Sequence, residues 1–117
     1  MNFALTDEQQ MIVDTVRSFV ETEIYPHENE VERTGHVPPE LGQEIARKCK
    51  EIGFFGCNMP EEVGGAGLDH TSFTLVEREL GRGSMALTVF FGRPSGILMA
   101  CNDEQRERYL LPAVSGE

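Results

Sequence analysis

The sequence predicts an all-α fold, a bundle of about five or six helices that forms a single domain over residues 1–117. Three observations support this prediction: apolar residues recur at helical spacing along nearly the whole chain, two capping-box patterns mark helix starts, and no alternating strand pattern occurs. A chain of 117 residues can also bury about two-thirds of its unfolded surface without disulfide bonds or metal ions.

The first helix is expected to begin after Thr6, because Gln9 stands three residues later and completes a capping box. Its apolar stripe consists of Ile12, Val16, Phe19 and Val20. Pro26 is expected to end this helix, because proline disfavours the helical conformation of the residue before it. Residues 27–36 are polar and are expected to form a solvated connection.

The second helix is expected to open at Pro38-Pro39 and to end at Gly53. Its apolar stripe is Leu41, Ile45, Cys49 and Ile52. Acidic residues come early and basic residues late, the order that complements the helix dipole: Glu40, Glu44, Arg47, Lys48 and Lys50. A third helix, capped by Asp69, is expected to carry Phe73, Val76 and Leu80.

The segment from Ser84 to Cys101 is different, because Arg93 is its only charge and its apolar side chains point around the whole helix circumference. It predicts a hairpin-like or kinked helical element at the centre of the bundle, with Pro94 removing a backbone donor. The run is interrupted before it reaches the length that a bilayer requires. A last helix follows with the Asn102 and Gln105 capping box, and Tyr109, Leu110 and Val114 are expected to face inward.

Residues Pro60–Gly67, PEEVGGAG, form a glycine-rich loop between the second and third helices. The loop lacks the Lys-Ser/Thr pair of a Walker motif, because Leu68-Asp69 follows it. A dinucleotide-binding fingerprint would need a further glycine where His70 stands. The loop is therefore interpreted as a structural turn that exploits the backbone freedom of glycine.

No residue is predicted to be catalytic, metal-binding or cofactor-binding on its own pattern. His27-Glu28 begins a zincin-like motif, but Val31 occupies the place of the second histidine, so His27 is interpreted as an exposed loop residue. His70 is expected to pack at a helix start, and the adjacent carboxylates Glu61-Glu62 are expected to be solvated. The three cysteines share no CxxC spacing, which favours buried thiols in a reducing compartment.

The net charge of −10 disfavours nucleic acid and anionic membrane surfaces as partners. It also suits coenzyme A poorly, unless basic groups elsewhere in a longer protein hold its phosphates. The N-terminus shows neither a secretion signal nor an Arg-rich transit peptide, so the cytoplasm is the expected location.

Four stretches in order resemble the N-terminal helical domain of the FAD-dependent acyl-CoA dehydrogenase family. The glycine-rich loop is similar to the family's signature turn, and three further stretches are similar to its first helix, third helix and closing helix: Phe3–Pro26, Leu75–Gly83 and Asn102–Glu117. Together they cover essentially the whole chain. The resemblance implies α,β-dehydrogenation of an acyl-CoA thioester in the full-length enzyme, with an electron-transfer partner and a homo-oligomeric assembly.

The resemblance also implies that the acyl chain of the substrate lies near Thr88, Val89, Phe90 and Phe91. These residues either line the acyl pocket or belong to the bundle core. The segment from Leu80 to Asn102 is about one helical turn shorter than is usual in the family, so the acyl chain length does not follow from it.

In the family, a central β-domain and a C-terminal helical domain hold the flavin and supply the catalytic glutamate, and this chain is expected to lack both. The chain alone is therefore expected to bind no FAD, to be inactive, and to self-associate through the face that contains Phe90 and Phe91. Two alternatives remain open: the same domain of a flavin oxidase or monooxygenase, and an autonomous helical binding module.

Overall fold

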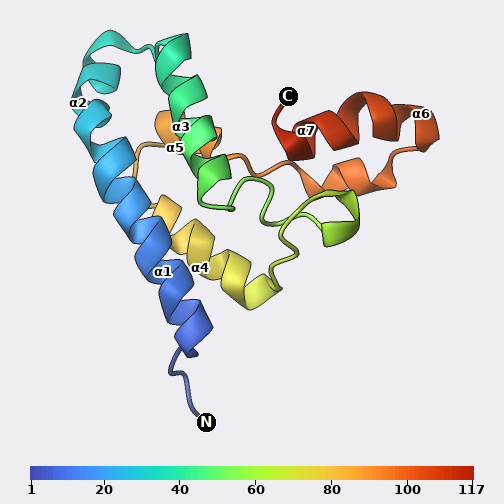
Figure 1. The fold of residues 1–117 in the computed structure, drawn as a ribbon. Coiled ribbons are helices and arrows are strands. Elements are labelled where there is room, and N and C mark those ends of the chain that lie inside the picture. Colours follow the sequence, from blue (N-terminus) through green and yellow to red (C-terminus); the bar gives the residue numbers. More distant parts are fainter. The chain divides into compact units, whose positions relative to one another are not determined.

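The computed structural model describes all of residues 1–117, and its regular structure is entirely helical, as predicted (Figure 1). Five main helical segments agree with the expected number: 7–34, 39–51, 70–80, 85–91 and 103–115. None of the helices is long and apolar enough to cross a membrane. The chain divides into two compact units, Met1–Val37 with His70–Thr88, and Pro38–Asp69 with Val89–Glu117.

The first unit is built on the packing of α1 (Asp7–Phe19) along α4 (His70–Leu80) (Figure 1). Thr6 caps α1, and the predicted capping box with Gln9 is confirmed. The predicted apolar stripe of the first helix is buried, together with Val13, and α4 buries Leu75, Val76 and Leu80. The short helix α5 (Met85–Thr88) packs on the segment that follows α1.

The prediction that Pro26 ends the first helix is wrong. After α1 the chain forms one π-helical turn, η1 (Val20–Ile24), and continues as α2 (Tyr25–Thr34) until Gly35, which has φ +64°. In the π turn the Tyr25 N–H bonds to the Val20 carbonyl, five residues back, which widens the helix just before the proline ring. Pro26 then lies in the first turn of α2, where its missing N–H costs little. Most of the expected connection, residues 27–36, is therefore helical.

The second unit begins with α3 (Pro39–Glu51), which packs on a 3-10 turn, η3 (Val89–Phe91). Ile45 and Cys49 are buried as predicted, whereas Ile52 is 40% exposed because it lies just past the helix end. The remaining core of this unit is a cluster of four buried side chains, Met59, Val63, Leu110 and Val114, with Leu98 and Leu111 packed against them.

The C-terminal helical segment comprises α6 (Asp103–Gln105), a π turn η5 (Arg106–Leu110) and α7 (Leu111–Ser115). The predicted capping box between Asn102 and Gln105 is confirmed. Leu110 and Val114 are buried, but the inward position predicted for Tyr109 is wrong, since it is 50% exposed. The π turn changes the register of the helix, so the spacing of an ideal α-helix assigns Tyr109 to the wrong face.

The prediction of a continuously buried element between Ser84 and Cys101 is only partly correct. The segment is broken into α5, η3 and a further 3-10 helix, η4 (Gly96–Ala100). Leu87 is fully buried, but Met85 is 82% exposed and Ile97 is 77% exposed. Because short helical pieces turn their side chains in several directions, the apolar composition of this segment does not lead to burial on all sides.

Candidate functional site

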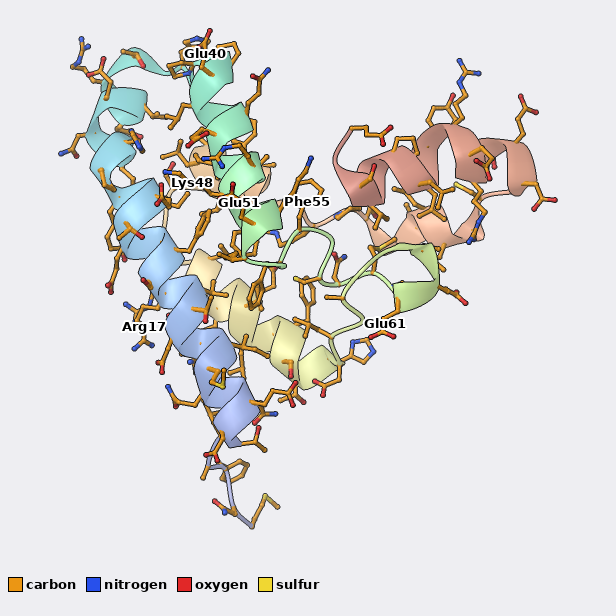
Figure 2. The ribbon with its side chains drawn as sticks, in the orientation of Figure 1. Arg17, Glu40, Lys48, Glu51, Phe55 and Glu61 are labelled. Carbon is orange, nitrogen blue, oxygen red and sulfur yellow. The ribbon has the colours of Figure 1, made fainter.

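The glycine-rich loop is a tightly constrained turn, and each of its three glycines is required by the geometry. Gly64 and Gly67 have φ of +92° and +63°, a region that favours glycine. Gly65 has no positive φ, but a Cβ at this position would lie 2.0 Å from the carbonyl oxygen of Met59. The first half of the loop contains η2 (Glu61–Val63), on which Glu61 is exposed as predicted (Figure 2).

The amide groups of this loop are used within the second unit. The Gly65 N–H donates to the Pro60 carbonyl at 3.0 Å, and the Gly67 N–H donates to the Met59 carbonyl at 2.9 Å. The Gly64 N–H likewise donates back to the Glu61 carbonyl at 2.9 Å. A phosphate-binding loop points its N–H groups at the ligand, so this arrangement supports the structural interpretation.

A shallow depression of about 400 Å³ adjoins the loop and the end of α7. Its lining includes the Lys50 side chain and the ring of Phe55, which is labelled in Figure 2. The centroid of this ring lies 5.2 Å from the Lys50 ammonium nitrogen. Lys50 Nζ also donates a hydrogen bond of 2.8 Å to the Gly116 carbonyl. The one cation of this depression therefore already binds a backbone oxygen.

The structure places the four predicted substrate-pocket residues in consecutive short helices. Thr88 ends α5 in the first unit and is only 4% exposed, whereas Val89, the first residue of η3 in the second unit, is 57% exposed. Phe90 and Phe91 both pack on α3, because the Phe90 ring covers Gly42 and the Phe91 carbonyl accepts a hydrogen bond from Cys49 Sγ at 2.8 Å. No contact tests their predicted role in binding an acyl chain.

The expected self-association face is not an exposed apolar surface in this structure. Phe91 is fully buried, and its ring centroid lies 6.0 Å from that of Phe54. Phe90 is partly buried. The oligomeric prediction therefore has no support from these two rings.

Sequence reasoning did not find a long-range hydrogen bond that fixes the start of α5. Glu28 on α2 accepts the backbone N–H of Ser84 with an Oε1–N distance of 2.6 Å. Ser84 immediately precedes α5, and its carbonyl accepts the N–H groups of Leu87 and Thr88. The sequence carries no signal for this bond, because Glu28 stands in a polar stretch among other carboxylates.

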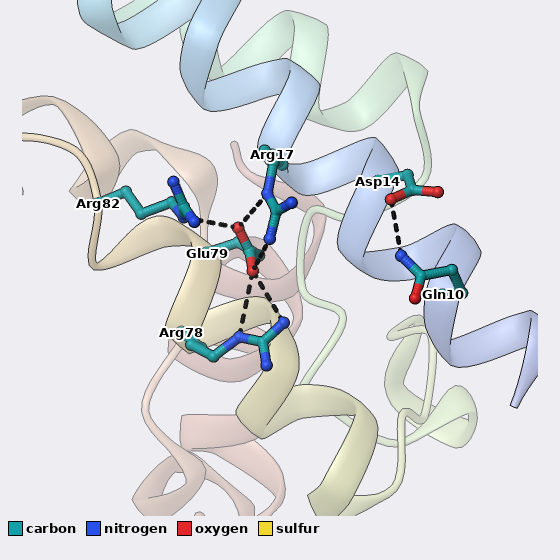
Figure 3. A network of polar contacts seen from close by, with 6 residues as sticks. All are labelled: Gln10, Asp14, Arg17, Arg78, Glu79 and Arg82. Atoms are coloured by element: carbon teal, nitrogen blue, oxygen red, sulfur yellow. Dashed lines mark hydrogen bonds and ion pairs between the residues drawn. The ribbon is translucent and has the colours of Figure 1, made fainter. Parts of the chain in front are cut away.

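The second feature that sequence reasoning missed is a buried carboxylate, Glu79, held by three arginines (Figure 3). Arg17 donates from Nε and Nη2, both at 3.0 Å, and joins α1 to α4. Arg78 and Arg82 bind the same carboxylate at 3.0 Å. The Arg17 hydrogen bonds hold the pKa of Glu79 below its usual range, although burial opposes this, and Glu79 raises the pKa of Arg17 in return. Glu79 stands three residues after Val76, a spacing that places both on one face of a helix, so the sequence could have indicated that Glu79 points inward.

The remaining chemically suggestive residues form no site. His27 lies within α2 and is partly buried, so its predicted place in an exposed loop is wrong, whereas His70 begins α4 as expected but is exposed. The structure contains no disulfide bond and no cluster of side chains that could hold a metal ion. Cys49 is buried as predicted, and burial raises the pKa of its thiol to about 12, which keeps it protonated.

Comparison with known proteins agrees with this fold. The family model of the acyl-CoA dehydrogenase N-terminal domain matches residues 6–117. A probable acyl-CoA dehydrogenase of Bacillus subtilis is 37% identical over 99% of the chain, and a 3-(aryl)acrylate reductase of Clostridium sporogenes is 35% identical over 96%. The crystal structure of an acyl-CoA dehydrogenase complexed with FAD from Bacillus anthracis superposes with a TM-score of 0.75, at 26% identity over 96% of the chain.

The chain corresponds to only part of these proteins. It spans 31% of the B. subtilis relative, 30% of the C. sporogenes relative and 19% of the B. anthracis chain. Since the family model nevertheless covers nearly all 117 residues, the chain belongs to the acyl-CoA dehydrogenase N-terminal domain family.

Proposed function

We propose that this chain is the N-terminal domain of a longer FAD-dependent enzyme that oxidises the α,β bond of an acyl-CoA thioester. The observation that carries the proposal is the family match over residues 6–117, together with a helical fold that a solved acyl-CoA dehydrogenase shares. In such an enzyme the domain contributes one side of the acyl pocket and surface for subunit packing. It supplies neither the catalytic base nor most of the flavin site.

The glycine-rich loop does not by itself fit the diphosphate of FAD, which requires donors or cations directed at its oxygens. The amides of Gly64, Gly65 and Gly67 and the ammonium of Lys50 already donate to backbone carbonyls. The buried side-chain atom without a partner, Asn58 Oδ1, is an acceptor and cannot bind a phosphate oxygen. We therefore place FAD on parts of the longer protein, where other residues surround it.

The residues proposed to lie near the acyl chain of the substrate are Thr88, Val89, Phe90 and Phe91. Thr88 and Phe91 are buried, so in this proposal they support the pocket surface from beneath and do not line it themselves. The exposed side chain of Val89 leaves an apolar surface that another part of a longer enzyme or a substrate can cover.

The proposed partners are an acyl-CoA substrate, a protein that accepts the electrons, and further copies of the same chain. Nucleic acid is disfavoured by the net charge of −10. We place the protein in the cytoplasm, a reducing compartment, because its three cysteines form no disulfide bond.

The test is to express the full-length gene product and, separately, the 117-residue chain. The full-length protein is expected to purify with bound FAD and to reduce an artificial electron acceptor when acyl-CoA is added. The 117-residue chain is expected to be colourless and inactive. A full-length protein that neither binds FAD nor responds to any acyl-CoA would refute the proposal, and a yellow 117-residue chain would contradict the assignment of FAD to other domains.

A second candidate, reduction of an α,β-unsaturated acyl substrate, is favoured by the relative named 3-(aryl)acrylate reductase. The two reactions involve the same carbon–carbon bond in opposite directions. They are distinguished by whether the enzyme turns over saturated acyl-CoA with an electron acceptor or unsaturated substrate with an electron donor.

A further inference from the structure

The last residues of the C-terminal helical segment are anchored to the end of α3. Lys50 Nζ donates a hydrogen bond of 2.8 Å to the carbonyl of Gly116, which follows α7. A Cβ at Gly116 would lie 2.5 Å from Lys50 Cε and 2.8 Å from Phe55 Cε1. Any other residue at this position would have to displace both side chains, so Lys50 and Phe55 determine the path of the chain up to Gly116.

The Phe55 ring is itself held in place at this anchor. Its centroid lies 5.2 Å from Lys50 Nζ, and a Cβ at Gly92 would lie 2.1 Å from Phe55 Cε2. The Gly92 carbonyl accepts the N–H of Gly56 at 2.7 Å, which ties the residue after Phe55 to the same stretch of backbone. The anchor is therefore a fixed feature of the second unit.

The shallow depression of about 400 Å³ begins at this anchor, because Lys50, Phe55 and Ser115 belong to its lining. Apart from Val114, the rest of the lining carries no side chain larger than a methyl group, since it consists of three glycines and Ala66. None of the 20 acidic residues of the chain lines it. The surface is therefore mainly backbone, an aromatic ring and aliphatic groups, which suits an apolar segment of polypeptide.

In a longer protein of this family, most of the polypeptide comes after the anchor. The chain spans 31% of the B. subtilis relative, and the family model that it matches describes an N-terminal domain. The first residue after Glu117 then starts at the rim of the depression, and three extended residues span about 10 Å. A segment tethered this closely reaches the depression at a higher effective concentration than a separate molecule does.

We propose that the depression is the docking surface for the residues that directly follow Glu117 in the longer protein, one of which places an apolar side chain against Phe55 and Val114. The inference rests on the proposed function, because only a longer protein has such residues. The docked segment is an ordered continuation of the second unit and not a flexible linker. It holds the start of the next domain beside the glycine-rich loop.

The experiment cross-links this contact in the full-length protein. Ala66→Cys places one thiol in the depression, and a second cysteine is introduced, one position at a time, among roughly six residues after Glu117, which span about 20 Å when extended. A disulfide forms only where the two Cα atoms come within about 7 Å of each other. Ala86→Cys is the matched control, because Ala86 is also exposed but does not line the depression.

Mild oxidation is expected to link the Ala66→Cys thiol to a few of these positions and the Ala86→Cys thiol to none. Mass spectrometry of the digested protein identifies the linked peptides and separates them from those of the three native cysteines. If Ala66→Cys does not fold, Gly53→Cys takes its place, because Gly53 lines the same depression and a Cβ there meets no atom within 4 Å.

Lys50→Met tests the anchor, because it keeps an aliphatic side chain and removes the ammonium group. The initial rate of cross-linking should fall about fivefold, the factor that corresponds to one net hydrogen bond. Lys48→Met is the matched control, since Lys48 lies on the same helix and pairs with Glu44 at 3.7 Å. It should leave the rate of cross-linking unchanged.

Three results would overturn the inference while leaving the proposed function intact: no cross-link from Ala66→Cys to any of these positions, a cross-link only between two protein molecules, or equal rates for Lys50→Met and Lys48→Met. A protein that forms the cross-link but oxidises no acyl-CoA would refute the proposed activity alone. A gene that ends at the codon for Glu117 would refute both.

Discussion

Replacing Gly65 by alanine should destabilise the chain severely, although this glycine has an ordinary φ angle. The new Cβ would lie 2.0 Å from the Met59 carbonyl oxygen, 2.5 Å from its carbon and 2.7 Å from the Gly56 oxygen. All three atoms belong to the backbone, so no side chain can rotate away, and the loop must open by about 1 Å to reach the 3.0 Å limit of real Cβ contacts.

The expected cost follows from the contacts that this opening disturbs. The hydrogen bonds from Gly65 to Pro60 and from Gly67 to Met59 hold the loop together. Their loss costs about 1 kcal/mol each, and the steric overlap adds about 1–3 kcal/mol. The free energy of unfolding should therefore fall by about 3–5 kcal/mol, a large part of the roughly 5–15 kcal/mol typical of a domain.

Two other glycines of the second unit provide matched controls. Gly53 has φ +80°, and a Cβ there would meet no atom within 4 Å, so Gly53→Ala should cost only the backbone strain of about 1–2 kcal/mol. Gly96 has neither a positive φ nor a close neighbour, and Gly96→Ala should be neutral or stabilising by up to about 1 kcal/mol.

The assay is urea denaturation of the 117-residue chain, followed by circular dichroism and analysed by linear extrapolation. The expected order of stability is Gly96→Ala, then Gly53→Ala, then Gly65→Ala. The reasoning would be refuted if Gly65→Ala were within about 1 kcal/mol of Gly96→Ala, roughly the uncertainty of such measurements, or if Gly53→Ala were the most damaging substitution.

Three further predictions concern single side chains. The folded pKa of Glu79 lies below the unfolded value of about 4.3, so its ionised form stabilises the fold above that pH. That contribution is lost as the pH falls through the folded pKa. The free energy of unfolding of Glu79→Gln should therefore fall less steeply with decreasing pH than that of the parent chain. Equal slopes of unfolding free energy against pH for the two proteins would contradict this. A thiol-alkylating reagent should modify the partly exposed Cys101 in the native chain but not Cys49, which should react only after unfolding. Asn102→Ala should lower the free energy of unfolding by about 1 kcal/mol through loss of the cap; an unchanged denaturation midpoint would count against it.

Features of the fold that depend on local interactions can be predicted from the sequence. Both capping boxes are confirmed because the residues that form them are three positions apart and need no distant partner. The glycine-rich loop is likewise a turn, as its composition indicates, and its family resemblance is confirmed. The sequence does not reveal that Gly65 serves a close backbone approach, because that contact depends on where Met59 lies.

The errors at Pro26 and Tyr109 both involve a π turn, η1 or η5, which holds more residues per turn than an α-helix. Before Pro26 the wider turn lets the helix continue past a residue that usually ends it, and at Tyr109 an ideal helical period misplaces the side chain. The Glu28–Ser84 hydrogen bond was harder to predict from the sequence. It joins residues 56 positions apart, and such a pairing leaves no periodic signal.

The arginines around Glu79 also determine the electric field of the first unit. Three of its four basic residues, Arg17, Arg78 and Arg82, surround this single buried carboxylate, and only Arg33 remains among the other acidic side chains. The solvent around the rest of this unit therefore experiences a negative potential that attracts cationic surfaces and repels anionic ones over about 8 Å at physiological ionic strength. The rate at which any charged molecule approaches this unit should accordingly depend on salt concentration.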